Sequence, residues 1–90
     1  MSREHGWAIC EKSPGKITKG PHAVGEAHSV SVPMVCPKGT RLTGVSHHHP
    51  GGSLQLSERD KSTAREKKLT HICVTVKGGK AKCYKFRHRK

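Results

Sequence analysis

A regular alternation of apolar and polar residues marks the end of the chain. Residues 70–77 read Thr-His-Ile-Cys-Val-Thr-Val-Lys, and every second residue from Ile72 is isoleucine or valine. A period of two is typical of a β-strand with one buried face. Gly78-Gly79 follows and suits a two-residue turn with positive φ, so residues 80–86 are expected to return as the partner strand. The pattern therefore predicts a C-terminal β-hairpin.

Shorter patterns predict further strands and one helix before this hairpin. The strands are expected over residues 6–11, 28–32 and 40–49, between turn-forming Pro and Gly residues. A helix is expected over residues 57–68. Ser57 suits its N-cap, and Asp60 suits the capping-box position three residues later, although Asp is shorter than the usual Glu or Gln. These elements predict one domain over residues 1–90, of α/β (α+β) class, built on one mixed sheet.

Composition adds a strong positive charge to this small domain. The chain has 18 Lys and Arg, six Asp and Glu, and a net charge of +12. Basic residues gather at the end: Lys77, Lys80, Lys82, Lys85, Arg87, Arg89 and Lys90. Such a charge favours acidic partners, including nucleic acid. Because only one Trp, one Tyr and one Phe are present to stack on bases, we favour a solvated basic terminus over a nucleic-acid site.

The sequence also bears on compartment. No stretch approaches the ~20 apolar residues that span a bilayer, and residues 1–6 carry no signal-peptide pattern. The cysteines Cys10, Cys36, Cys73 and Cys83 contain no C-x-x-C pair, so each is expected to be a small buried apolar residue. The two-residue turn would place Cys73 and Cys83 on opposite faces of the hairpin, which argues against a disulfide between them. We expect a soluble, cytoplasmic protein with no membrane partner.

Metal-binding side chains cluster between the third predicted strand and the helix. His47 and His49 would point to the same face of a strand, because side chains alternate along it. Asp60, in the first turn of the helix, could return to that face. Two imidazoles and one carboxylate make a three-ligand zinc site with a fourth position open for water, the catalytic type of zinc site. His48 points to the opposite face and is interpreted as a packed or surface residue.

Each of these residues also has a simpler explanation. Eight histidines make a His-x-His pair easy to obtain by chance, and Ser57 and Asp60 could serve only as a helix cap. A zinc hydrolase also needs a general base. Glu11 and Glu58 are expected at the surface, which leaves Glu4 and Glu26, and the pattern alone does not decide between them.

The spacing His47-x-His49-x7-Ser57-x2-Asp60 resembles the motif of the JAMM (MPN+) zinc metalloproteases, the family of zinc-dependent deubiquitinases and their prokaryotic relatives. In that family a Glu-x-Gly sequence followed by apolar residues precedes the motif, and residues 4–10, Glu-His-Gly-Trp-Ala-Ile-Cys, are similar to it. The resemblance covers nearly the whole chain and selects Glu4 over Glu26. It implies the family's cytidine-deaminase-like fold. The family's usual helix before the Glu is missing here, which suggests a minimal form or a homodimer.

The resemblance implies a function as well. His47, His49 and Asp60 would hold Zn²⁺, Glu4 would be the general base, and Ser57 would donate a hydrogen bond to the oxyanion. The reaction would be hydrolysis of a peptide or isopeptide bond in a protein or peptide substrate, with a ubiquitin-like modifier as one candidate. The alternatives are a basic nucleic-acid-binding protein and a non-catalytic metal-binding scaffold of the same family.

Overall fold

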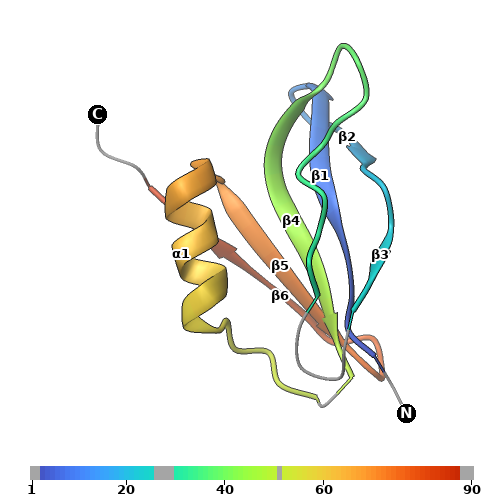
Figure 1. Ribbon diagram of the computed structural model, residues 1–90, viewed down its shortest axis with the longest axis vertical. Helices are drawn as coiled ribbons and strands as arrows, with labels where there is room; N and C mark the ends of the chain where they lie inside the picture. Colours follow the sequence, from blue (N-terminus) through green and yellow to red (C-terminus); the bar gives the residue numbers. More distant parts are fainter. Residues whose placement is uncertain (1–2, 26–29, 51, 88–90) are drawn as a thin grey trace.

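The computed structural model describes residues 3–25, 30–50 and 52–87. Within them the strands and the helix follow the order β1 (His5–Ser13), β2 (Lys16–Lys19), β3 (Ala23–Val24), β4 (Arg41–His49), α1 (Glu58–Lys67), β5 (His71–Val76) and β6 (Ala81–Lys85) (Figure 1). The strands expected over residues 6–11 and 40–49, the helix and both strands of the hairpin are confirmed, within one to two residues at most ends. No helix among these residues is long and apolar enough to cross a membrane.

The strands form a mixed sheet in the order β2-β1-β4-β5-β6, with β3 paired to β1. Strands β4 and β5 are parallel, and α1 makes the crossover between them, while the other pairs are antiparallel. A parallel pair needs such a long connection, because a tight turn can join only antiparallel strands. The molecule is thus a small mixed α+β domain, as the sequence predicts.

Helix α1 begins and ends on local sequence signals. The Ser57 hydroxyl accepts a hydrogen bond from the backbone N–H of Asp60 at 3.1 Å, and the Asp60 carboxylate accepts one from the N–H of Ser57 at 3.1 Å. This reciprocal pair is the predicted capping box. The helix ends at Lys67, and its C-cap Lys68 has a left-handed φ of 53° that stops further helical hydrogen bonding.

One face of the sheet carries the core. Val45, Ala64, Leu69 and Ile72 are buried together where α1 packs on β4 and β5. Residues 30–36, which we call the strap, cross the same face over β1 (Figure 1). Burying these side chains excludes water from the face, which is the main favourable term in such packing.

The strand expected over residues 28–32 is wrong where it can be examined. Residues 28 and 29 lie outside the described part, and residues 30–32 are not in a strand. Val32 and Met34 pack against the core cluster instead, so the alternating pattern reflects packing of the strap. Pro33 also lacks the N–H that a strand ladder requires.

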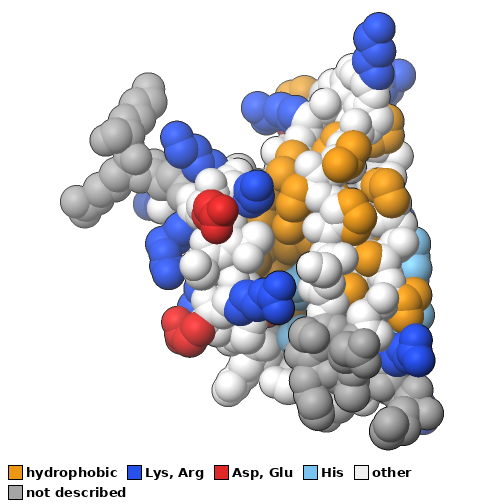
Figure 2. Space-filling model, in the orientation of Figure 1, with side chains coloured by type: hydrophobic (Ala, Val, Ile, Leu, Met, Phe, Trp, Pro, Cys, Tyr) orange, Lys and Arg blue, Asp and Glu red, His pale blue; other side chains and the backbone are white. Residues whose placement is uncertain are grey.

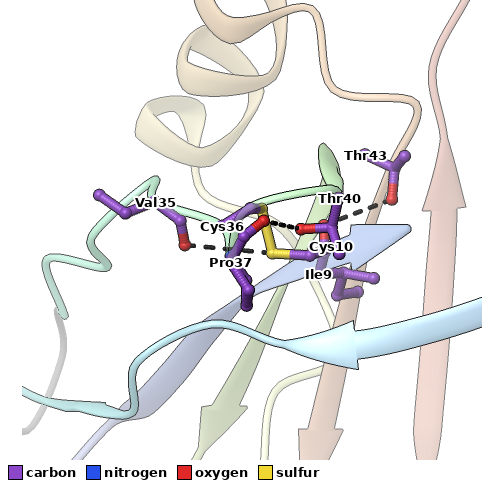
Figure 3. Close-up of a disulfide and its surroundings, with 7 residues drawn as sticks. All are labelled: Ile9, Cys10, Val35, Cys36, Pro37, Thr40 and Thr43. Carbon is purple, nitrogen blue, oxygen red and sulfur yellow. Dashed lines mark hydrogen bonds between the residues drawn. A yellow bond between two sulfur atoms is a disulfide. The ribbon is translucent and has the colours of Figure 1, made fainter. Parts of the chain in front are cut away.

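The expectation for the cysteines is also wrong. Cys10 on β1 is bonded to Cys36 at the end of the strap, with 5.7 Å between the Cα atoms (Figure 3). Cys73 on β5 is bonded to Cys83 on β6. Cys10 is fully buried, as expected, but Cys83 is exposed. The first disulfide therefore fixes the strap to the sheet, and the second links the two strands of the hairpin.

The register of the hairpin explains the second correction. Cys73 pairs with Cys83 and Thr75 with Ala81, and the Val76 N–H donates to the carbonyl of Lys80. The loop therefore contains residues 77–79 rather than Gly78-Gly79 alone. One added residue moves every cross-strand pair by one position, which brings the two cysteines onto the same face.

Candidate metal centre

Strand β4 places two of its three consecutive histidines on the face that carries α1. His47 is 7% exposed, and both His47 and His49 line a cavity beside the helix. His48 points to the other face, where its Nδ1 lies 3.0 Å from the hydroxyl of Thr75. This arrangement follows from the alternation of side chains along a strand, as predicted.

Glu4 reaches the same place from the residue before β1. Its carboxylate is largely buried, and Oε1 lies 3.7 Å from Nε2 of His49. Among the described residues, Glu4, His47 and His49 form a group whose potential ligand atoms all lie within 4.8 Å of one another. Segments far apart in the sequence therefore meet because β1 and β4 are neighbouring strands.

Gly6 makes this approach sterically feasible. It pairs with His47, and a Cβ atom built on it would lie 2.6 Å from Cγ2 of Val32 and 3.1 Å from Cδ2 of His47. A side chain there would collide with both the strap and the candidate ligand. The Glu-x-Gly sequence at residues 4–6 thus has a physical reason, since only glycine lets the strap lie this close to the β1–β4 pair.

The hydrogen bonding of His49 fixes the role of its two ring nitrogens. Nδ1 lies 3.0 Å from the carbonyl oxygen of Ser53. A carbonyl only accepts, so Nδ1 is the donor, and neutral His49 then has a lone pair on Nε2. That lone pair faces the carboxylate of Glu4, an arrangement that a proton or a metal ion between the two groups would stabilise. An outer hydrogen bond of this kind is typical of metal-binding histidines.

His47 provides a second unsatisfied nitrogen. Its Nδ1 is buried and has no hydrogen-bond partner among the described residues, although Oδ1 of Asp60 lies 3.4 Å away. Burial lowers the pKa of His47 below 6.5, partly offset by the negative charge of Asp60 and reinforced by His49. The neutral imidazole is the form that binds metals. A buried ring nitrogen without a hydrogen bond is available to coordinate a metal ion.

Asp60 and Ser57 lie beside this group rather than within it. The carboxylate of Asp60 contacts His47 with one oxygen and caps α1 with the other. Asp60 does not belong to the 4.8 Å group that the described residues form. Ser57 is exposed and lines the same cavity. The structure therefore brings the five predicted residues around one cavity, where Glu4 lies within reach of both histidines and Asp60 contacts His47.

The other carboxylates considered as general bases are elsewhere. Glu11 pairs with Arg41 at 3.0 Å, near the end of β1 far from Glu4, and Glu58 pairs with Lys61 at 3.4 Å on the outside of α1. Glu26 lies outside the described residues.

A cavity of about 510 Å³ contains the centre and continues along α1. Figure 2 shows it as a hollow between the helix and the strap, with hydrophobic side chains in its depth and histidine toward its lower end. Sequence reasoning did not identify Ser53, the strap or the helix residues Arg59 and Lys67 as parts of this site. The spacing of four residues from Arg59 to Thr63 and Lys67 could have indicated that these helix residues share one face. No local sequence signal indicates that the strap forms part of the site.

Comparison with known proteins finds no matching protein-family model, no matching curated protein and no matching solved structure.

Proposed function

We propose that this chain is a zinc-dependent hydrolase of peptide or isopeptide bonds, of the JAMM type. Its sheet would then be a form of that family's cytidine-deaminase-like fold. The proposal rests chiefly on one observation: Glu4, His47 and His49 converge within 4.8 Å, with Asp60 and Ser57 on the same cavity wall. The residues that the motif selects come from segments that are distant in the sequence, so their convergence on one cavity is not expected by chance.

The donor set suits a zinc ion. Imidazole nitrogens and carboxylate oxygens are common zinc ligands, and the sites of zinc hydrolases keep one position for water. His47 and His49 would bind through nitrogens that lack a hydrogen-bond donor, and Asp60, whose Oδ1 lies 3.4 Å from Nδ1 of His47, would complete the set. When bound, zinc supplies a Lewis acid and brings the pKa of a coordinated water toward about 7.

The protein's own groups supply the proton transfers. Glu4 accepts the proton of the attacking water at a carboxylate oxygen and then delivers it to the leaving amine. Ser57 keeps a free O–H, because its oxygen only accepts in the helix cap. This O–H donates to the oxyanion of the tetrahedral intermediate. The Ser53 carbonyl holds the His49 ring in one orientation during these steps.

A peptidase assay with matched variants tests the proposal. Wild-type protein with one equivalent of zinc should cleave a peptide or a ubiquitin-like conjugate, and a chelator should stop cleavage. Glu4→Gln should keep the metal and lower the rate by about 10²–10⁴. Glu26→Gln is the control and should leave the rate unchanged. Zinc binding without cleavage of any substrate would favour the non-catalytic scaffold.

The charge on β6 supports a second candidate, a binder of nucleic acid. Lys82, Lys85 and Arg87 are exposed on this edge strand and just beyond it. Such a protein would bind DNA or RNA with affinity that falls steeply with salt and does not respond to chelation. A salt titration with and without chelator separates the two functions.

The sequence predicts the cytoplasm, whereas the two disulfides are typical of oxidising compartments.

A further inference from the structure

The cavity continues beyond the histidines over an apolar surface. Its partly exposed side chains are Val32 and Met34 of the strap and Leu56 before α1, and they pack on the buried core that contains Val45 and Ile72. The hydrophobic floor is visible in the hollow between α1 and the strap (Figure 2). A volume of about 510 Å³ lies within the range of binding pockets. A substrate held at the centre therefore also meets an apolar floor.

The helix wall of the cavity is polar and basic. Arg59, Thr63 and Lys67 line it, and their spacing of four residues places them in one row along α1. Arg59 and Lys67 are exposed, so their charged ends are open to a ligand at the rim. Lys61 is not part of this row and pairs with Glu58 at 3.4 Å. Two cations thus stand along the rim of an apolar channel.

Helix geometry gives the distance from these cations to the centre. An α-helix rises about 1.5 Å per residue, so Lys67 lies about 10 Å further along the axis than Asp60. Asp60 contacts His47 and therefore marks the position of the centre. An extended peptide advances about 3.3 Å per residue, so about three residues span that distance. Arg59, in the first turn of the helix, stands near the scissile bond.

We infer that the cavity binds an extended peptide that carries an aliphatic residue over the apolar surface of Val32, Met34 and Leu56 and an acidic residue about three positions from the scissile bond, opposite Lys67. This inference rests on the proposed function and specifies its substrate class. Charge complementarity supports an acidic occupant, because the net charge is +12 and the two acids of the cavity wall, Glu4 and Asp60, lie at the histidine end. A peptide carboxylate at Lys67 would therefore meet a cation and avoid both acids.

Labelled peptides test this inference independently of catalysis. One peptide carries Leu and Glu at the inferred positions, a second has Gln in place of Glu, and a third has Ala in place of Leu. The three peptides are made in two sets, with the acidic position before the scissile bond in one set and after it in the other. Binding is measured by fluorescence anisotropy with zinc-loaded Glu4→Gln protein, and cleavage by liquid chromatography with wild type. In at least one set, the Glu peptide should bind about twofold to fivefold tighter than the Gln peptide. The peptide with Leu should bind about tenfold tighter than the peptide with Ala.

Two helix variants assign the charge preference to the rim. Lys67→Gln should abolish the difference between the Glu and Gln peptides, whereas Lys61→Gln should retain it. Both positions are exposed, so both variants should fold. A double-mutant cycle that combines Lys67→Gln with the change from Glu to Gln in the peptide isolates the interaction between Lys67 and the peptide carboxylate.

The outcomes distinguish this inference from the proposed function. Charge-dependent binding without cleavage by wild type supports the peptide site and counts against the hydrolase. Cleavage with equal affinity for the Glu and Gln peptides keeps the hydrolase and overturns the inference. A Glu preference that survives Lys67→Gln, or an oligonucleotide that displaces the acidic peptide from the cavity, overturns it as well.

Discussion

His49 points its Nε2 at the carboxylate of Glu4, 3.7 Å away, while its Nδ1 donates to the carbonyl of Ser53. A neutral His49 so oriented has no hydrogen to offer Glu4, so a cation between them would stabilise the pair. We therefore predict that the purified protein binds about one equivalent of zinc. His49→Ala should weaken binding at least about tenfold, measured by metal analysis and chelator competition.

His48→Ala is the matched control for this prediction. His48 is the neighbouring residue on the same strand, but it faces Thr75 on the other side of the sheet. Its removal should leave zinc affinity unchanged. Wild-type protein without stoichiometric zinc, or equal losses in the two variants, would remove the basis for the metal centre.

Ser57 combines a structural role and a chemical role, and two substitutions separate them. Glycine is a good N-cap but lacks a hydroxyl, so Ser57→Gly should cost only a few tenths of a kcal/mol of stability, whereas Ser57→Ala should cost about 1 kcal/mol. Both variants should lower the hydrolysis rate by about 10²–10³, because both lose the oxyanion donor. Urea unfolding and peptide cleavage measure the two effects. Full activity in Ser57→Gly would restrict Ser57 to capping.

The buried imidazole of His47 should make the metal-free protein less stable at acid pH. Burial holds the pKa of His47 below its ordinary value of 6.5, so between the folded and unfolded pKa values the unfolded chain binds more protons. The contribution of His47 is therefore complete above pH 6.5 and declines as the pH falls toward the folded pKa. Urea unfolding at about pH 7.5 and about pH 5.5 measures the decline. His47→Gln should reduce it and His48→Gln should not, and an unchanged decline in His47→Gln would assign it to other groups.

The two disulfides should contribute unequally to stability. Loop-closure entropy predicts about 3.5 kcal/mol for Cys10–Cys36, with a sequence separation of 26, and about 2.7 kcal/mol for Cys73–Cys83, with a separation of 10. Paired Cys→Ser variants and urea unfolding measure these values. Peptide cleavage should fall in the Cys10/Cys36 variant, because the strap forms one wall of the cavity. The Cys73/Cys83 variant should stay active. Thiol titration of unfolded, unreduced wild-type protein checks the pairings themselves, and four reactive thiols would contradict both disulfides.

Local signals explain what the sequence predicted correctly. The capping box between Ser57 and Asp60 involves residues three positions apart, so it can be recognised without knowing the fold. The common face of His47 and His49 follows from the period of a strand. The sheet pairing that brings Glu4 beside them was not predictable from such signals, and the family resemblance supplied that choice.

Non-local packing explains the errors. Two glycines at residues 78 and 79 allow a loop of two or three residues, and the difference reverses the predicted relation of Cys73 to Cys83. The alternation at residues 30–32 resembles a strand, but Val32 packs on the core from a segment without strand pairing. The packing of Val32 depends on the position of β1 beneath the strap, which no local pattern reveals. Likewise, nothing in the sequence near Cys36 indicates that its disulfide partner is Cys10.

Strand β4 also gives the protein three adjacent spectroscopic probes. His47 and His49 sample the cavity, while His48 samples the opposite face of the sheet beside Thr75. In nitrogen-15 NMR spectra, metal or peptide binding should shift the ring signals of the two outer histidines and leave the middle one in place. A single labelled residue type would then report occupancy of the cavity and the integrity of the opposite face in the same experiment.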